Sequence, residues 1–129
     1  TNSFLQWVKH TDAEVVLTHP VGYELKDEFT NGVAYTSNQK EAFECADFVY
    51  AKNWSSYSHY GGKPEVLEDW TVTEGLMSLT NHGKFMHCLP IRRNVVATDA
   101  VIDNSIVYQQ AKNREIGAQV VLKKILESL

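Results

Sequence analysis

The sequence predicts an α/β domain, a Rossmann-like three-layer sandwich with a mostly parallel sheet, and three observations support that fold class. Short apolar runs of strand length alternate with segments of helical periodicity along the 129 residues. The run Val15–Leu17 is continuously apolar, as in strands covered on both faces of a parallel sheet. Pro90 follows the run 84–88 and ends that strand, because proline has no N–H to donate into a sheet. In open α/β sheets, ligands bind beyond such carboxyl ends.

Capping residues and periodicity predict each element in order. Asn38, with Glu41 three residues later, forms a capping box, and Thr73 is a second capping residue. The expected helices cover residues 2–10, 38–46, 73–80 and 111–129, with single helical turns near 26–28 and 99–103. The expected strands cover residues 15–17, 33–35, 47–51, 84–88 and 105–108. These elements alternate without an internal repeat or interdomain linker, which indicates one domain.

The first helix is expected to begin at a polar residue, Asn2 or Ser3, and to bury an apolar face. Phe4, Trp7 and Val8 share that face at helical spacing. Because the chain begins without Met and directly at this helix start, we expect a fragment of a longer protein.

Composition excludes several classes of protein. A hydrophobic content of 43% argues against disorder, and a net charge of −4 gives no electrostatic footprint for nucleic acid. No apolar run approaches the roughly 20 residues of a membrane span, and no signal-peptide pattern opens the chain. The two cysteines, Cys45 and Cys88, lie in different predicted elements, so we expect a reduced, cytoplasmic protein without membrane partners.

Metal and phosphate motifs are weak in this sequence. None of the five histidines forms a His-x₃-His pair or a His-Glu-x-x-His motif, so no metal site is expected. Gly61–Lys63 lacks the Walker spacing and is interpreted as part of a flexible loop. The polar, aromatic segment Asn53–Lys63 is long for a connection in a compact domain, and such loops are often functional.

The segment His87–Asn94 carries the densest chemistry. A histidine, a thiol and two guanidinium groups lie at or just after the end of the predicted strand. His87 is a poor base for Cys88, because adjacent strand residues point to opposite faces, and this argues against a cysteine hydrolase. The alternative is a buried strand with a core cysteine and two solvated arginines.

His-Cys-Leu-Pro at 87–90, followed by Arg92 and by Asn113-Arg114 at an expected helix start, resembles the aspartate/ornithine carbamoyltransferase family. The longer run 87–94 is most similar to the N-acylornithine branch, and the likeness extends over nearly the whole chain. The resemblance implies subunits of two α/β domains, homotrimers and a reaction in arginine biosynthesis that needs no cofactor. Residues 1–129 match only the second, ornithine-binding domain and lack its first strand. The carbamoyl-phosphate domain, with its Ser-x-Arg-Thr-like segment, is absent from this sequence.

The resemblance also implies roles for individual residues, with carbamoyl phosphate and N-acylornithine as the bound partners. The substrate amine attacks the carbamoyl carbon, so no protein nucleophile is needed. The Leu89 carbonyl would orient the reacting groups and Arg114 would stabilise the oxyanion. The implied catalytic residues are Cys88, Leu89 and Arg114, and the implied substrate-binding residues are Lys52, Arg92, His87 and Pro90. Without the resemblance, Arg114 and Lys52 are ordinary solvated residues.

Two departures bear on the substrate. Ala51-Lys52-Asn53-Trp54 replaces the Ser-Met-Gly-type loop of ordinary ornithine transcarbamylases, which fits a substrate whose α-amine is acylated. Val96 stands where the acetylornithine branch is expected to carry a lysine, which favours N-succinylornithine. The alternatives are N-acetylornithine, plain ornithine, and a non-catalytic α/β binding module that retains the fold.

Overall fold

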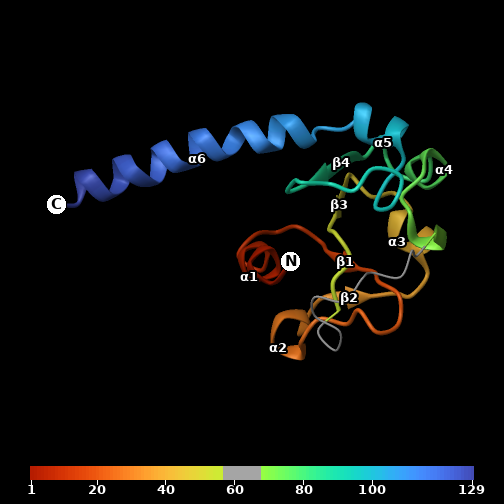
Figure 1. Ribbon diagram of the computed structural model, residues 1–129. Helices are drawn as coiled ribbons and strands as arrows, with labels where there is room; N and C mark the ends of the chain where they lie inside the picture. Colours follow the sequence, from red (N-terminus) through yellow and green to blue (C-terminus); the bar gives the residue numbers. More distant parts are fainter. Residues whose placement is uncertain (57–67) are drawn as a thin grey trace.

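The computed structural model describes residues 1–56 and 68–129, in which short helices and strands alternate (Figure 1). The helices are α1 (Asn2–Val8), α2 (Asp27–Thr30), α3 (Gln39–Phe43), α4 (Glu74–Met77), α5 (Asp99–Asp103) and α6 (Val107–Glu127), with a 3-10 turn η1 at Glu68–Trp70. The strands are β1 (Val16–Leu17), β2 (Ala34–Tyr35), β3 (Phe48–Ala51) and β4 (Lys84–His87). β1 pairs with β2 and β3 pairs with β4, both in parallel. The predicted α/β class with parallel strands is confirmed.

The pair β3–β4 lies beside the core. In β4 the side chains alternate, so that Phe85 and His87 are buried while Lys84 is exposed. The register places Ala51 opposite His87, which brings the carboxyl ends of both strands to the same edge. The buried core cluster consists of Phe43, Val72, Phe85, Ala97, Val101, Ile102 and Val107. Residues 52 and 88, the first residues after β3 and β4, are therefore neighbours.

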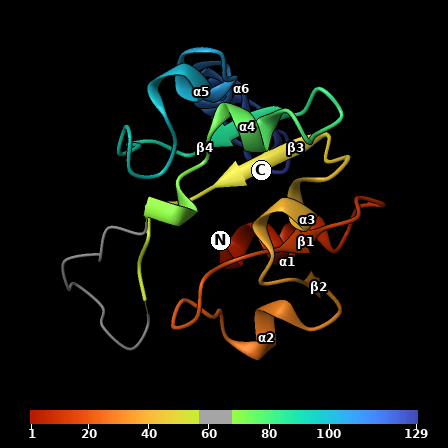
Figure 2. The ribbon, with the colours of Figure 1, turned by 90° about the vertical axis from the view of Figure 1, so that its right-hand side faces the viewer.

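The expected single sheet is divided into two two-stranded sheets. Figure 2 shows β3 and β4 side by side, with β1 and β2 below them. The prediction that Val15–Leu17 is buried is wrong at its centre, since Val16 is 51% exposed. β1 has one strand partner, β2.

The predicted last strand at 105–108 is wrong. Ile106 does donate its N–H to the carbonyl of Phe85 (3.2 Å), but α6 begins at the next residue, Val107. The Val107 side chain is fully buried, so its burial is achieved from a helix start rather than from a strand. Arg114 therefore lies about two turns inside α6 instead of at the helix start predicted for it.

The predicted helix caps are confirmed at two positions and wrong at a third. The side chains of Asn38 and Thr73 accept hydrogen bonds from the N–H groups of Lys40 and Leu76. The capping box with Glu41 is not formed, because the Asn38 N–H donates to Thr36 Oγ1 while Glu41 accepts from the Thr36 hydroxyl. In α1, however, the N-cap is Thr1 rather than Asn2 or Ser3.

The buried face of α1 also differs from the prediction. Leu5 and Val8 are buried, whereas Trp7 is 63% exposed. Phe4 instead packs edge-on against the ring of Tyr50, with the ring centroids 4.9 Å apart. Leu5 therefore takes the buried position that the sequence assigned to Trp7.

Helix α6 starts beside β4 and extends away from the other elements toward the C-terminus (Figure 1). Its apolar side chains beyond the first turn are exposed; they include Ile116, Val120, Val121, Leu122, Ile125, Leu126 and Leu129. Among the described residues no helix combines the length and the apolar character that crossing a membrane requires.

Candidate functional site

The side chains of Lys52 and Cys88 meet where β3 and β4 end. Lys52 Nζ donates a hydrogen bond to Cys88 Sγ at 2.8 Å. The same ammonium group lies 5.9 Å from the centre of the Tyr50 ring, within range of a cation–π attraction. The side chains that follow the two strands thus meet at one sheet edge, and the strand register explains their contact across 36 residues of chain.

Cys88 is an exposed thiol rather than a core residue. The hydrogen bond from Lys52 lowers the pKa of the Cys88 thiol, because it stabilises the thiolate form. His87 is buried at 1% exposure and lies on the opposite face of the strand end. The expectation that His87 cannot serve Cys88 as a base is confirmed by this geometry, and the core-cysteine alternative is wrong.

We expect Lys52→Met to slow alkylation of Cys88 by iodoacetamide at pH 7 roughly threefold or more, because the thiol loses the group that favours its thiolate. Mass spectrometry of the purified protein measures the rate at each cysteine. Cys45, the other exposed thiol, is the internal control, and its rate should not change. Equal Cys88 rates in both proteins would show that the contact with Lys52 does not activate the thiol.

His87 is held by hydrogen bonds at its backbone and its ring. Its backbone N–H donates to Gln110 Oε1 in the first turn of α6 (3.0 Å), and its ring Nδ1 accepts from the N–H of Leu89 (3.0 Å). Burial, and then the charge of Lys52, lower the pKa of His87, so the ring is neutral at neutral pH. Since Nδ1 accepts, the ring proton is on Nε2. Nε2 is buried and has no hydrogen-bond partner among the described residues, and the substrate contact that the resemblance implies for His87 stays a prediction.

The turn that follows β4 is tied to the end of β3. Asn53 Nδ2 donates to the carbonyl oxygen of Pro90 at 2.9 Å. The peptide bond between Leu89 and Pro90 is cis, and Leu89 has a φ of +51°, in the left-handed region. Through this contact, the turn at Leu89 and Pro90 is joined to the segment that follows β3.

The two arginines of the motif differ in their surroundings. Arg93 forms ion pairs with Asp99 and Asp103 of α5, at 2.6 Å for Asp103, so it fastens the loop to that helix. Arg92 is exposed, and among the described residues its guanidinium has no hydrogen-bond or ion-pair partner. Arg92 is therefore available to a ligand, whereas Arg93 is not.

Arg114 is exposed on α6 and has no ion-pair partner among the residues that the structure describes. It follows Gln110 by four residues, so it lies on the same side of the helix and about 6 Å further along the axis. Gln110 contacts the end of β4, so Arg114 lies one turn beyond the residue that makes this contact. No hydrogen bond joins Arg114 to residues 87–90 in the described part of the chain.

A cavity of about 180 Å³ opens beside Lys52. It lies between the two sheets, because residues at the ends of both β1 and β3 line it. Val96, buried at 2% exposure, forms part of its wall. Trp54 is another wall residue, and its buried indole N–H has no hydrogen-bond partner among residues 1–56 and 68–129. The walls of this gap between the sheets thus include Lys52, the N-terminal residue Thr1 and the unpartnered donor of Trp54.

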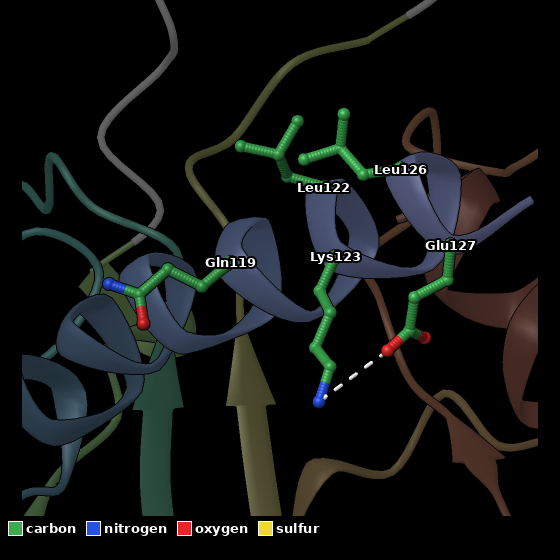
Figure 3. Close-up of a pocket in the computed structure, with 5 residues that line it drawn as sticks. All are labelled: Gln119, Leu122, Lys123, Leu126 and Glu127. Atoms are coloured by element: carbon green, nitrogen blue, oxygen red, sulfur yellow. Dashed lines mark ion pairs between the residues drawn. The ribbon is translucent and has the colours of Figure 1, made fainter. Parts of the chain in front are cut away.

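A second hollow, along the last turns of α6, has a different character. Figure 3 shows Leu122 and Leu126 on one side of the helix and the ion pair of Lys123 with Glu127 (3.7 Å) on another. All of the residues that line this hollow belong to α6, so it is a feature of one helix surface.

The described part of the chain contains no candidate metal site, because no three His, Cys, Asp or Glu side chains lie together there. The segment Gly61–Lys63 lies outside the described residues.

Two residues that join the site were not among the individual site residues predicted from the sequence. Asn53 follows Lys52 directly in sequence, so its position beside a candidate ligand residue was a usable signal. Gln110 had no such signal, because it was assigned to the boundary between a wrongly predicted strand and a helix.

The comparisons with known proteins agree on one family. The model of the aspartate/ornithine carbamoyltransferase Asp/Orn-binding domain matches residues 1–124. The N-succinylornithine carbamoyltransferase of Bacteroides fragilis is 50% identical over 99% of this chain and 42% of that protein. The N-acetylornithine carbamoyltransferase of Xanthomonas campestris is 47% identical over 57% of this chain and 24% of that protein.

A solved structure supports the same fold. A crystal structure of acetylornithine transcarbamylase complexed with acetylcitrulline superposes with a TM-score of 0.77 and 34% identity, over 88% of this chain and 40% of that one. The chain belongs to the aspartate/ornithine carbamoyltransferase family. It spans about two fifths of the length of the N-succinylornithine carbamoyltransferases that it matches.

Proposed function

We propose that this chain is the amino-acid-substrate domain of an N-acylornithine carbamoyltransferase that acts on N-succinylornithine in arginine biosynthesis. The observation that carries the proposal is the cluster of Lys52, Cys88 and the Leu89–Pro90 turn at the carboxyl ends of β3 and β4. Relatives of nearly 50% identity over almost the whole chain are N-succinylornithine carbamoyltransferases, which supports this substrate.

The proposed reaction transfers a carbamoyl group from carbamoyl phosphate to the δ-amine of the acylornithine. The amine nitrogen forms a bond to the carbamoyl carbon, the bond from that carbon to the phosphate oxygen breaks, and the amine loses a proton. The Leu89 carbonyl accepts a hydrogen bond that orients the reacting groups. Arg114 stabilises the charge that develops on the carbonyl oxygen. The Lys52 ammonium and the Arg92 guanidinium hold carboxylates of the substrate, and the reaction needs no metal or organic cofactor.

Val96 supports the succinyl preference. Its side chain is apolar and lines the cavity that also contains Lys52, and its backbone is held by bonds to Arg92 and Val72. The support is the sequence position itself, because the acetylornithine branch is expected to carry a lysine where this chain has Val96. The proposed site therefore leaves recognition of the acyl carboxylate to Lys52, Arg92 and groups outside this chain.

We also propose that residues 1–129 form this domain without its first strand. The gap between β1 and β3, where the cavity lies, is the position in which an additional strand would unite the two sheets. A separate domain would bind carbamoyl phosphate, and homotrimers in the cytoplasm are the proposed assembly and compartment. A non-catalytic binding module is less favoured, because simple binding does not require Arg114.

The test of this function uses Lys52→Met and Arg92→Met in the complete enzyme. Each variant should weaken N-succinylornithine binding about ten- to hundredfold, because charge-assisted hydrogen bonds contribute roughly 1.5–3 kcal/mol each. Carbamoyl phosphate affinity should change far less, since its phosphate binds elsewhere. Steady-state kinetics with ornithine, N-acetylornithine and N-succinylornithine measure both effects.

Lys40→Met, a change of an exposed lysine on α3, is the matched control and should leave both affinities unchanged. If the two site variants weaken carbamoyl phosphate as strongly as the amino acid, the roles assigned here are wrong. An unmodified enzyme that prefers free ornithine would exclude the acylornithine assignment.

A further inference from the structure

We propose that His87 and Asn53 are positioning residues that hold Leu89 in its left-handed conformation and so aim the Leu89 carbonyl at the reacting groups. This inference rests on the proposed function, because it concerns the residue that orients the carbamoyl group there. In this proposal His87 holds the backbone of Leu89 and does not contact the substrate.

The need for such support comes from the backbone of Leu89. Its φ of +51° lies in a region that residues with a large side chain rarely adopt. A backbone in such a region persists only when its surroundings hold it, and it is often found at functional sites. Leu89 is half-buried among residues that pack on the core, so its side chain is anchored while its peptide groups still need to be oriented.

Two side chains supply that orientation from opposite ends of the turn. Before Leu89, its own N–H donates to His87 Nδ1 at 3.0 Å. After it, Asn53 Nδ2 donates to the Pro90 carbonyl at 2.9 Å. The carbonyl of Leu89 lies between these two tethered peptide groups. Neither tether uses that carbonyl oxygen, which leaves its lone pairs for a ligand.

His87 is itself immobilised, which makes it an effective support. Its side chain is 1% exposed, and its backbone is held by β3 and by the side chain of Gln110. A ring fixed in this way presents Nδ1 at one position. Asn53 is joined to the site through its neighbour Lys52, which contacts Cys88. Both tethers therefore connect the turn to the parallel strands whose ends form the site.

The experiment compares two amides at position 87 in the complete enzyme. In His87→Asn the side-chain oxygen lies near the place of Nδ1 and can accept from Leu89, whereas in His87→Gln the longer side chain places its oxygen near Nε2. We expect His87→Gln to lower kcat about tenfold, the loss for one hydrogen bond of this strength, with little change in the KM for N-acylornithine. His87→Asn should restore most of the turnover.

Asn53→Asp provides an independent test at a surface position, where misfolding is not expected. It replaces the donor with a carboxylate that cannot donate to the Pro90 carbonyl, and kcat should fall about tenfold. Asn31→Asp, the same change at an exposed asparagine after α2, is the matched control. Wild-type kcat in Asn53→Asp, or a raised KM with unchanged kcat in His87→Gln, would overturn the proposal.

Hydrogen exchange at the Leu89 amide separates this inference from the proposed function. Exchange should be slow in the wild-type protein and in His87→Asn, and about tenfold faster in His87→Gln, whether or not carbamoyl transfer occurs. If the wild-type enzyme does not carbamoylate N-acylornithine, the proposed function is wrong. The exchange rate of the Leu89 amide still shows whether His87 holds that amide. Equal exchange in all three proteins would overturn it.

Discussion

A polypeptide of residues 1–129 is expected to show no carbamoyl transfer when it is mixed with carbamoyl phosphate and N-succinylornithine. The cluster at 52 and 88–90 offers groups for the amino acid, but the sequence contains no Ser-x-Arg-Thr-like segment for the phosphate. Holding both reactants together corresponds to effective concentrations on the order of 10⁵–10⁸ M, and most of that advantage is absent when one reactant is unbound. The complete enzyme should turn over under the same conditions.

Mass spectrometry of the carbamoylated product measures both reactions. The control is the 1–129 polypeptide combined with the separately produced remainder of the enzyme, since recovered turnover would show that the polypeptide is folded and competent. Turnover by the polypeptide alone, with its N-terminus verified, would contradict the prediction. It would also require a phosphate site within these residues that the cluster does not contain.

The parts of the fold that could be predicted from sequence are those set by short-range chemistry. Asn38 and Thr73 cap helices because their side chains reach N–H groups two or three residues away. Pro90 ends β4 for an equally local reason, the missing N–H. That residues 52 and 88 lie close together could also be predicted, because neighbouring parallel strands end at the same edge of a sheet.

The parts that could not be predicted depend on contacts between distant residues. Ile106 and Val107 have β-branched side chains that favour strands, yet the core accepts Val107 from a helix start and tertiary packing overrides the local preference. That error moved the helix start by four residues and placed Arg114 in a first turn that it does not occupy. The role proposed for His87 depends on its burial against α6, which no local pattern near the motif reveals.

Asn53 illustrates a middle case. Its sequence position beside Lys52 indicated a functional loop, but the partner of its side chain lies 37 residues away at Pro90. Only the β3–β4 register makes that contact predictable, and the register in turn depends on which strands pair. The residues proposed to contact ligands were therefore easier to identify from the sequence than the residues proposed to hold them in place.

Arg114→Ala in the complete enzyme is expected to lower kcat about 10²- to 10³-fold while changing the KM for N-acylornithine far less. A guanidinium that stabilises the developing oxyanion acts mainly in the transition state, and loss of one such donor has this scale. In the structure, Arg114 lies one turn after Gln110, the residue of α6 that contacts the end of β4. Being exposed and without an ion-pair partner among the described residues, it is not committed to a structural pair.

Two further variants sharpen this test through single-turnover and steady-state kinetics. Arg114→Lys keeps the charge but loses the planar pair of donors, so it should recover only part of the lost turnover. Lys112→Ala removes a cation two residues earlier, about 200° around the helix, and should leave kcat unchanged. Wild-type turnover in Arg114→Ala would identify Arg114 as an ordinary solvated residue of α6. An equal loss in Lys112→Ala would show that the effect comes from the overall charge of the helix. A specific contact with the oxyanion would lower kcat only in the Arg114 variant.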